Sequence, residues 1–189
     1  SQGDSRAMAP KENNALLAVK AADTLRVAVK ADAPPFGFKL GKSFAGFEID
    51  ILGAVAREIG VKNIVYVPVV SNERTKVLER GDVDLVIATM TITRSRDRDI
   101  DFSLPYFQDG QMLLVGKDSK IKNYLDLDGK SVACIKGSTS EKTLRIVAPA
   151  AQFKVYSNNK EMIAALIDGS VEAITTDSIV LESIRNKNA

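Results

Sequence analysis

The sequence predicts an α/β protein with two similar lobes, each formed by a doubly wound sheet. Three observations support this fold class. Short strand-like runs alternate with amphipathic helical patterns along most of the chain, which is typical of sheets covered by helices on both faces. The same order of elements is found in both halves of the chain. The halves also share sequence, since residues 78–86 (LERGDVDLV) align with residues 166–174 (LIDGSVEAI) at leucine, glycine, valine and an acidic residue.

The first half of the chain predicts the order β-α-β-α-β. Its first strand shows a period of two, and its first helix shows the 3.6-residue period of a half-buried helix. Gly60 is the predicted C-cap of that helix, while Ser71 and Gly81 are the predicted N-cap and stop of the second helix. The last of the five elements, residues 83–88, is almost continuously apolar, as a buried parallel strand requires. The five elements cover residues 24–29, 48–59, 63–70, 71–80 and 83–88.

The second half repeats this alternation of strands and helices after a strand-like segment, the crossing, that leads over from the first half. The crossing and the six elements after it cover residues 111–116, 131–135, 138–147, 153–156, 159–168, 171–175 and 178–186. A glycine between a helix and a strand is common, so the short sequence match alone is weak, and the repeated order of elements is the better argument for two like lobes.

We expect three parts in the chain: an N-terminal extension over residues 1–23, a first lobe over residues 24–110 and a second lobe over residues 111–189. The first 11 residues are polar and irregular, and they are not expected to be part of either lobe. Open α/β sheets bind ligands at the carboxyl ends of their strands, so the crevice between the lobes is the predicted site.

Composition excludes several classes of protein. A net charge of +2 and a pI of 8.6 are too balanced for a protein that binds nucleic acid or a membrane surface. Histidine is absent, which excludes histidine-based catalysis and the commonest metal ligand. The single cysteine, Cys134, lies in an apolar run and is predicted to be buried rather than nucleophilic. We therefore expect no cofactor, no metal and no nucleic-acid partner.

The ends of the predicted strands carry a chemically consistent set of polar residues. Lys30 follows the first strand, Thr89 and Thr91 follow the third, and Asp177 follows the last. A lysine in such a place is commonly just solvated, and threonine is common in turns. Taken together, however, these groups would complement the α-carboxylate and the α-ammonium of one small ligand.

Two further features favour a carboxylate site. The segment STSE over residues 138–141 is a capping box in which Ser138 caps the helix and Thr139 opens it. A helix N-terminus offers free N–H groups to an anion, although starting a helix explains the motif equally well. Arg96 follows Thr93 by three residues, so Thr93 can cap a turn from which Arg96 projects the bidentate fork that a carboxylate prefers.

Six segments that include most of these residues resemble, in order, the polar-amino-acid (family 3) periplasmic solute-binding proteins of ABC importers. The resemblance extends from about Leu25 to the end of the chain. Each segment alone is weak evidence for the resemblance, whereas six segments in the same order are strong evidence. The segments are residues 46–51 (GFEIDI), 84–93 (DLVIATMTIT) with Arg96, 102–107 (FSLPYF), 127–130 (LDGK), 137–139 (GST) and 176–178 (TDS).

The resemblance implies the two-lobed, type II Venus-flytrap fold of periplasmic binding proteins, which closes around a free amino acid and delivers it to an ABC permease in the membrane. It implies that Arg96, Thr91 and the region of Thr139 hold the α-carboxylate, and that Asp177 and the Thr89 carbonyl hold the α-ammonium. It also implies a monomer in the periplasm or outside the cell, with or without a lipid anchor, whose signal peptide is not in this chain.

Within this family the sequence is most similar to the glutamate/aspartate binders. Ala33 and Ser71 stand where glutamine and basic-amino-acid binders place aromatic or bulky apolar residues, and Lys30 and Arg74 lie nearby. The resemblance therefore implies an acidic amino acid as ligand. Family members also continue past a helix like 178–186 and return to complete the first lobe, so the C-terminal part of this fold is expected to be missing.

Two other functions share this architecture. One is a sensing domain of a receptor kinase or ligand-gated channel, which flanking transmembrane sequence would favour. The other is an enzyme of the cyclohexadienyl dehydratase type, which uses a carboxylate in the cleft as an acid. No unassigned glutamate stands at a predicted strand end, so we expect a binding protein and not an enzyme.

Overall fold

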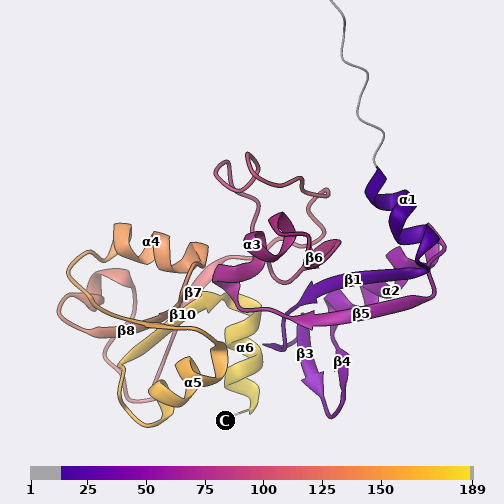
Figure 1. Cartoon of the computed structure of the whole chain (residues 1–189). Coiled ribbons are helices and arrows are strands. Elements are labelled where there is room, and N and C mark those ends of the chain that lie inside the picture. Colours follow the sequence, from indigo (N-terminus) through magenta and orange to yellow (C-terminus); the bar gives the residue numbers. More distant parts are fainter. Residues whose placement is uncertain (1–13, 188–189) are drawn as a thin grey trace, which may run out of the picture.

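Two main sheets, one in each half of the chain, form the framework of the protein (Figure 1). The computed structural model describes residues 14–187. In the first lobe, β1 (Thr24–Val29) lies between β5 (Asn63–Pro68) and β6 (Leu85–Ile87), and both neighbours are parallel to it. The predicted first strand is confirmed at both ends.

Alternation along β1 explains why helices cover both faces of this sheet. Val27 and Val29 point into a core shared with α2 (Phe47–Ile59), while Ala28 points into a core on the other face, which includes residues of α3 (Arg74–Glu79). A helix that the sequence did not predict, α1 (Asn14–Ala21), lies within the expected N-terminal extension. Its Val19 is buried in the same core as Val27.

The second sheet has the strand order β7-β10-β8-β9. Three of its strands are parallel, and β7, the predicted crossing, is its antiparallel edge. Alternate residues of β8 again face different helices: Ala133 and Ile135 pack with α5 and α6, and Val132 and Cys134 pack with α4. The elements are β7 (Gln111–Val115), β8 (Ser131–Ile135), α4 (Thr139–Val147), β9 (Gln152–Tyr156), α5 (Asn159–Ile167), β10 (Ala173–Asp177) and α6 (Ser178–Lys187), with a 3₁₀ turn at Tyr124–Leu127.

Both lobes are therefore doubly wound, as the sequence predicted, and Cys134 is a buried core residue. Burial raises the pKa of its thiol to about 11, which suits a small apolar side chain rather than a nucleophile. The lobe limits at residues 24–110 and 111–189 stay our proposal, and residues 1–13 of the expected extension lie outside the described part of the chain.

A small antiparallel sheet between β1 and α2 was not predicted. It consists of β2 (Asp32–Ala33), β3 (Gly37–Leu40) and β4 (Ser43–Ala45). Phe36, at its first turn, is buried among residues of the second lobe, so this sheet brings the two lobes into apolar contact.

The predicted N-cap at Ser71 is wrong. Ser71 lies inside a 3₁₀ turn (Ser71–Glu73), the preceding Val70 supplies no side-chain cap, and α3 begins only at Arg74. The predicted Gly60 cap is confirmed, because Gly60 ends α2 in the left-handed conformation that glycine adopts most readily.

Gly46 fixes where α2 begins. It has φ 123°, and the first amides of the helix donate to the preceding turn, from Phe47 to the Pro35 carbonyl and from Glu48 to the Phe36 carbonyl. A Cβ atom on Gly46 would lie 2.2 Å from the Phe36 carbonyl oxygen. Only glycine therefore allows the turn and the helix to approach this closely.

We predict that Gly46→Ala destabilises the protein by about 2 kcal/mol or more, because the backbone conformation is unfavourable for alanine and the new methyl group clashes with backbone. Urea unfolding would measure the change. Gly53→Ala is the matched control within the same helix. Its Cβ would meet only the Arg57 side chain at 3.6 Å, so it should stabilise by about 0.5–1 kcal/mol. Equal effects of the two substitutions would contradict this account of the helix start.

Candidate functional site

The predicted site residues converge on a small cavity where the two lobes meet. The cavity has a volume of about 30 Å³. Seven of the eight predicted residues line it, namely Lys30, Arg74, Thr89, Thr91, Ser138, Thr139 and Asp177. The eighth, Arg96, lies beside the cavity. Strand ends that are far apart in the sequence are thus brought together as predicted.

Arg96 connects the lobes directly. One guanidinium nitrogen donates to the Thr91 carbonyl of the first lobe at 2.7 Å, and the other donates to the Gly137 carbonyl of the second lobe at 3.1 Å. The Thr93 hydroxyl accepts from the Arg96 amide, as the predicted cap requires. Burial lowers the pKa of Arg96, but the guanidinium remains charged. Both of its bonds to carbonyls are bonds that a ligand carboxylate could replace with stronger ones.

The N-terminus of α4 faces the same cavity. The Ser138 hydroxyl accepts from the Glu141 amide at 3.0 Å, which confirms the predicted N-cap, and the Glu141 carboxylate accepts from the Gly137 amide. The Thr139 hydroxyl lies 3.3 Å from the Thr91 hydroxyl of the first lobe. A Cβ atom on Gly137 would lie 2.7 Å from the Asn72 side chain, so the lobes touch here.

Two cations were predicted to contact the side chain of the ligand, and both are buried and already bonded to other groups of the protein. Lys30 is 3% exposed, and its ammonium lies 3.0 Å from the Asp32 carboxylate. Arg74 is also 3% exposed and donates to the carbonyls of Ser71, Ala88 and Thr89 at 2.7–2.9 Å. Burial and the nearby charge of Arg96 lower the pKa of Arg74 to about 10.

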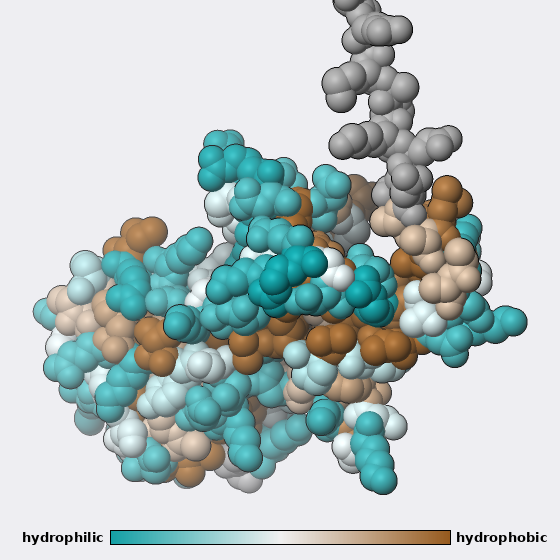
Figure 2. Space-filling view, viewed as in Figure 1, coloured by the Kyte–Doolittle hydropathy of each residue, from teal (hydrophilic) through white to brown (hydrophobic). Residues whose placement is uncertain are grey.

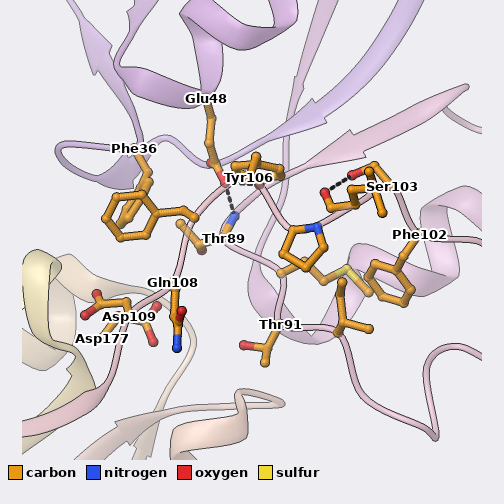
Figure 3. A pocket seen from close by; sticks show the side chains of 15 residues that line it. Phe36, Glu48, Thr89, Thr91, Phe102, Ser103, Tyr106, Gln108, Asp109 and Asp177 are labelled. Atoms are coloured by element: carbon orange, nitrogen blue, oxygen red, sulfur yellow. Dashed lines mark hydrogen bonds between the residues drawn. The ribbon is translucent and has the colours of Figure 1, made fainter.

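Glu48 is a site residue that the sequence reasoning missed. Its side chain is 1% exposed, and one carboxylate oxygen accepts from the Thr89 amide and from the Tyr106 hydroxyl, both at 2.7 Å (Figure 3). Burial raises the pKa of Glu48 despite these bonds. The spacing of Glu48 with buried Leu52 and Ala56 on one face of α2 was the signal that could have revealed it.

Asp177 lies at the end of β10, on the second-lobe side of the cavity. Burial and the neighbouring Asp109 raise the pKa of its carboxyl, and Arg74 opposes this shift. The Asp109 carboxylate accepts hydrogen bonds from the Ser178 hydroxyl and the Ile179 amide, so both of its oxygens are already bonded to the start of α6.

A larger cavity of about 320 Å³ adjoins the small one and shares Thr89, Thr91 and Asp177 with it. The segment 102–107 forms part of its wall, with Glu48 beside Tyr106, while Asp109 and Asp177 lie across the cavity from Phe102 (Figure 3). Part of this segment is exposed, with Leu104 87% accessible. The face drawn in Figure 2 likewise has apolar side chains gathered across its middle, between two largely polar regions.

Fold and site together define a two-lobed α/β binding protein with a charged crevice between its lobes. Residues 25–186 match the bacterial extracellular solute-binding proteins, family 3, and the chain belongs to this family. The family and the relatives named below are described as binding proteins rather than enzymes, in agreement with the prediction from the sequence.

Known relatives agree with this assignment. The chain is 39% identical to the ABC transporter glutamine-binding protein GlnH of Bacillus subtilis (strain 168), over 94% of this chain and 67% of GlnH. It is 42% identical to the glutamine-binding protein of Geobacillus stearothermophilus, over 89% of this chain and 66% of that protein. A glutamate-binding protein of Corynebacterium efficiens, GluB, is 30% identical over 88% of this chain and 60% of its own length.

Solved structures show the same fold. An ancestral arginine-binding protein bound to glutamine superposes with a TM-score of 0.84 and 39% identity, over 88% of this chain and 74% of that one. The chain spans about two thirds of the length of the curated relatives it matches. Within residues 14–187, none of the helices has the length and apolar character needed to cross a membrane.

We predict that Glu48→Gln flattens the pH dependence of stability. The pKa of Glu48 is higher in the folded than in the unfolded protein, so its contribution is full below the unfolded pKa of about 4.3 and is lost as pH rises through the folded pKa. Glutamine does not titrate. The free energy of unfolding, measured in urea from about pH 4 to neutral, should therefore fall less in the variant. Glu58→Gln, an exposed position on the same helix, is the control, and an identical pH profile for Glu48→Gln and wild type would contradict the prediction.

Proposed function

We propose that this protein binds a free α-amino acid between its lobes, outside the cytoplasm, and delivers it to an ABC permease. The observation that carries the proposal is that Arg96 and Asp177 flank one cavity from opposite lobes. Arg96, the Thr91 and Thr139 hydroxyls and the N-terminus of α4 would hold the α-carboxylate. Asp177 and the Thr89 carbonyl would hold the α-ammonium. The ABC transporter protein GlnH among the relatives supports the role in transport.

The charges around the cavity favour a ligand with a neutral side chain. Three cations, Lys30, Arg74 and Arg96, stand close to the acids Asp32, Glu48, Asp109 and Asp177, and burial raises the pKa of Glu48 and of Asp177. A zwitterion with a neutral side chain adds no net charge to this set, whereas an acidic side chain adds one buried negative charge that needs its own partner. The acidic ligand predicted from Lys30 and Arg74 assumed unpaired cations, and both are engaged by the protein itself. We therefore place glutamine ahead of glutamate and aspartate, and two of the relatives above are named as glutamine-binding proteins.

We predict that Arg96→Ala and Asp177→Asn each weaken amino-acid binding by roughly 30-fold to several thousandfold. Each removes one partner of a desolvated charge pair, which costs about 2–5 kcal/mol. Isothermal titration calorimetry against the twenty amino acids would measure the affinities. Arg98→Ala removes an exposed arginine two residues from Arg96 and should leave them unchanged. Binding by Arg96→Ala within threefold of wild type would contradict the assignment.

We also predict that the lobes separate to admit the ligand. A cavity of about 30 Å³ holds roughly two water molecules, far less than an amino acid needs. Small-angle X-ray scattering should therefore give a larger radius of gyration for the ligand-free protein than for the protein saturated with ligand. An identical scattering profile in the two states would argue against hinge motion and for a rigid site.

A further inference from the structure

Asp32 of the first lobe contacts the start of α5 in the second lobe. One oxygen of its carboxylate accepts from the Asn159 backbone amide at 2.6 Å, and its backbone carbonyl accepts from the Asn159 side-chain Nδ2 at 3.1 Å. The other carboxylate oxygen pairs with Lys30 at 3.0 Å. The aspartate therefore connects a site cation to the opposite lobe. A negative charge at this position is also favoured by the N-terminus of the helix.

Asn159 is held at one end of its amide and has no partner at the other. The residue is 5% exposed and lines the same small cavity as Lys30 and Asp177. Its Nδ2 donates to Asp32, which fixes the orientation of the amide, while its Oδ1 is buried without a hydrogen-bond partner among the described residues. A buried acceptor left without a donor destabilises the closed form. A ligand that supplies the donor would remove this penalty.

We propose that Asp32 and Asn159 select the side chain of the ligand, an inference that rests on the proposed amino-acid binding. The Oδ1 atom of Asn159 accepts a hydrogen bond from a donor on the ligand side chain. The terminal NH₂ group of glutamine provides this donor, whereas the ionised carboxylate of glutamate places acceptor against acceptor. Asp32 acts as a positioning residue: it orients the Asn159 amide and keeps the Lys30 ammonium occupied, so that this cation is not offered to an acidic side chain.

Selection and closure are the same event in this arrangement. The Asp32–Asn159 contact exists only when the lobes are together, since the two residues belong to different lobes. An amide ligand satisfies Asn159 as the contact forms. A carboxylate ligand leaves Asn159 unsatisfied and adds a second acceptor to it, so the closed state is disfavoured for glutamate even where its α-groups bind normally.

The ratio of glutamine affinity to glutamate affinity tests the inference. Calorimetric titration of both amino acids into the full wild-type chain should show preference for glutamine. Asn159→Ala removes the acceptor and should lower the ratio by roughly tenfold or more, mainly through weaker glutamine binding. Asp32→Asn removes the partner charge of Lys30 and should lower the ratio through stronger glutamate binding. The control is Asn158→Ala at the preceding residue, the N-cap of α5, which does not line this cavity and should leave the ratio unchanged.

The outcomes separate the inference from the function on which it rests. Equal losses for both ligands in Asn159→Ala would mean that Asn159 is structural or binds a trapped water molecule, and would overturn the selection. A ratio within twofold of wild type in both variants, or a wild-type preference for glutamate, would also overturn it while leaving amino-acid binding intact. Failure of the wild-type chain to bind any amino acid would overturn the proposed function itself.

Discussion

The rest of the structure depends on one constraint: the charges where the two lobes meet are buried, and a buried charge is stable only with a partner. Lys30, Arg74 and Glu48 are each at most 3% exposed. Lys30 meets the constraint with a carboxylate and Arg74 with three backbone carbonyls. One oxygen of Glu48 has an amide and a phenol as partners, while its other oxygen is buried without a hydrogen-bond partner among the described residues, in line with the raised pKa of this carboxyl. These contacts join β1, α2, α3 and the loop after β6. The groups that give the crevice its charge therefore also give it its shape.

The loop after β6 shows how this works. Thr89 has φ 49°, a conformation that a β-branched residue adopts rarely and at some cost in free energy. It is held from both sides, because Glu48 accepts from its amide and Arg74 donates to its carbonyl. The position of Glu48 depends in turn on the close approach of Gly46 to the Phe36 carbonyl. A glycine in the sequence thus determines, through a buried acid, how the first lobe presents Thr89 and Thr91 to the crevice.

The sequence predicted those parts of the fold and site that depend on local pattern. The strands over residues 24–29 and 131–135 were predicted at both ends because their hydrophobic periods are regular, and the polar residues at strand ends met because parallel strands end at one edge. The small sheet of β2, β3 and β4 was missed, since strands of two to four residues are too short to show a period. Asn159 was missed because its partner, Asp32, is 127 residues away and belongs to the other lobe.

An acidic ligand was predicted because the sequence shows which residues are charged but does not show which of these charges are already paired within the protein. Lys30 and Arg74 were counted as two cations facing the crevice, but Lys30 pairs with Asp32, which is only two residues away in the chain. An arginine bonded to three carbonyls can support a loop without attracting an anion to it. In a family whose members are named for glutamine, glutamate or arginine, the same fold can thus serve different ligands. Under the proposed function, the ligand of this protein depends on which buried charges the protein neutralises itself and which it leaves for the ligand to neutralise.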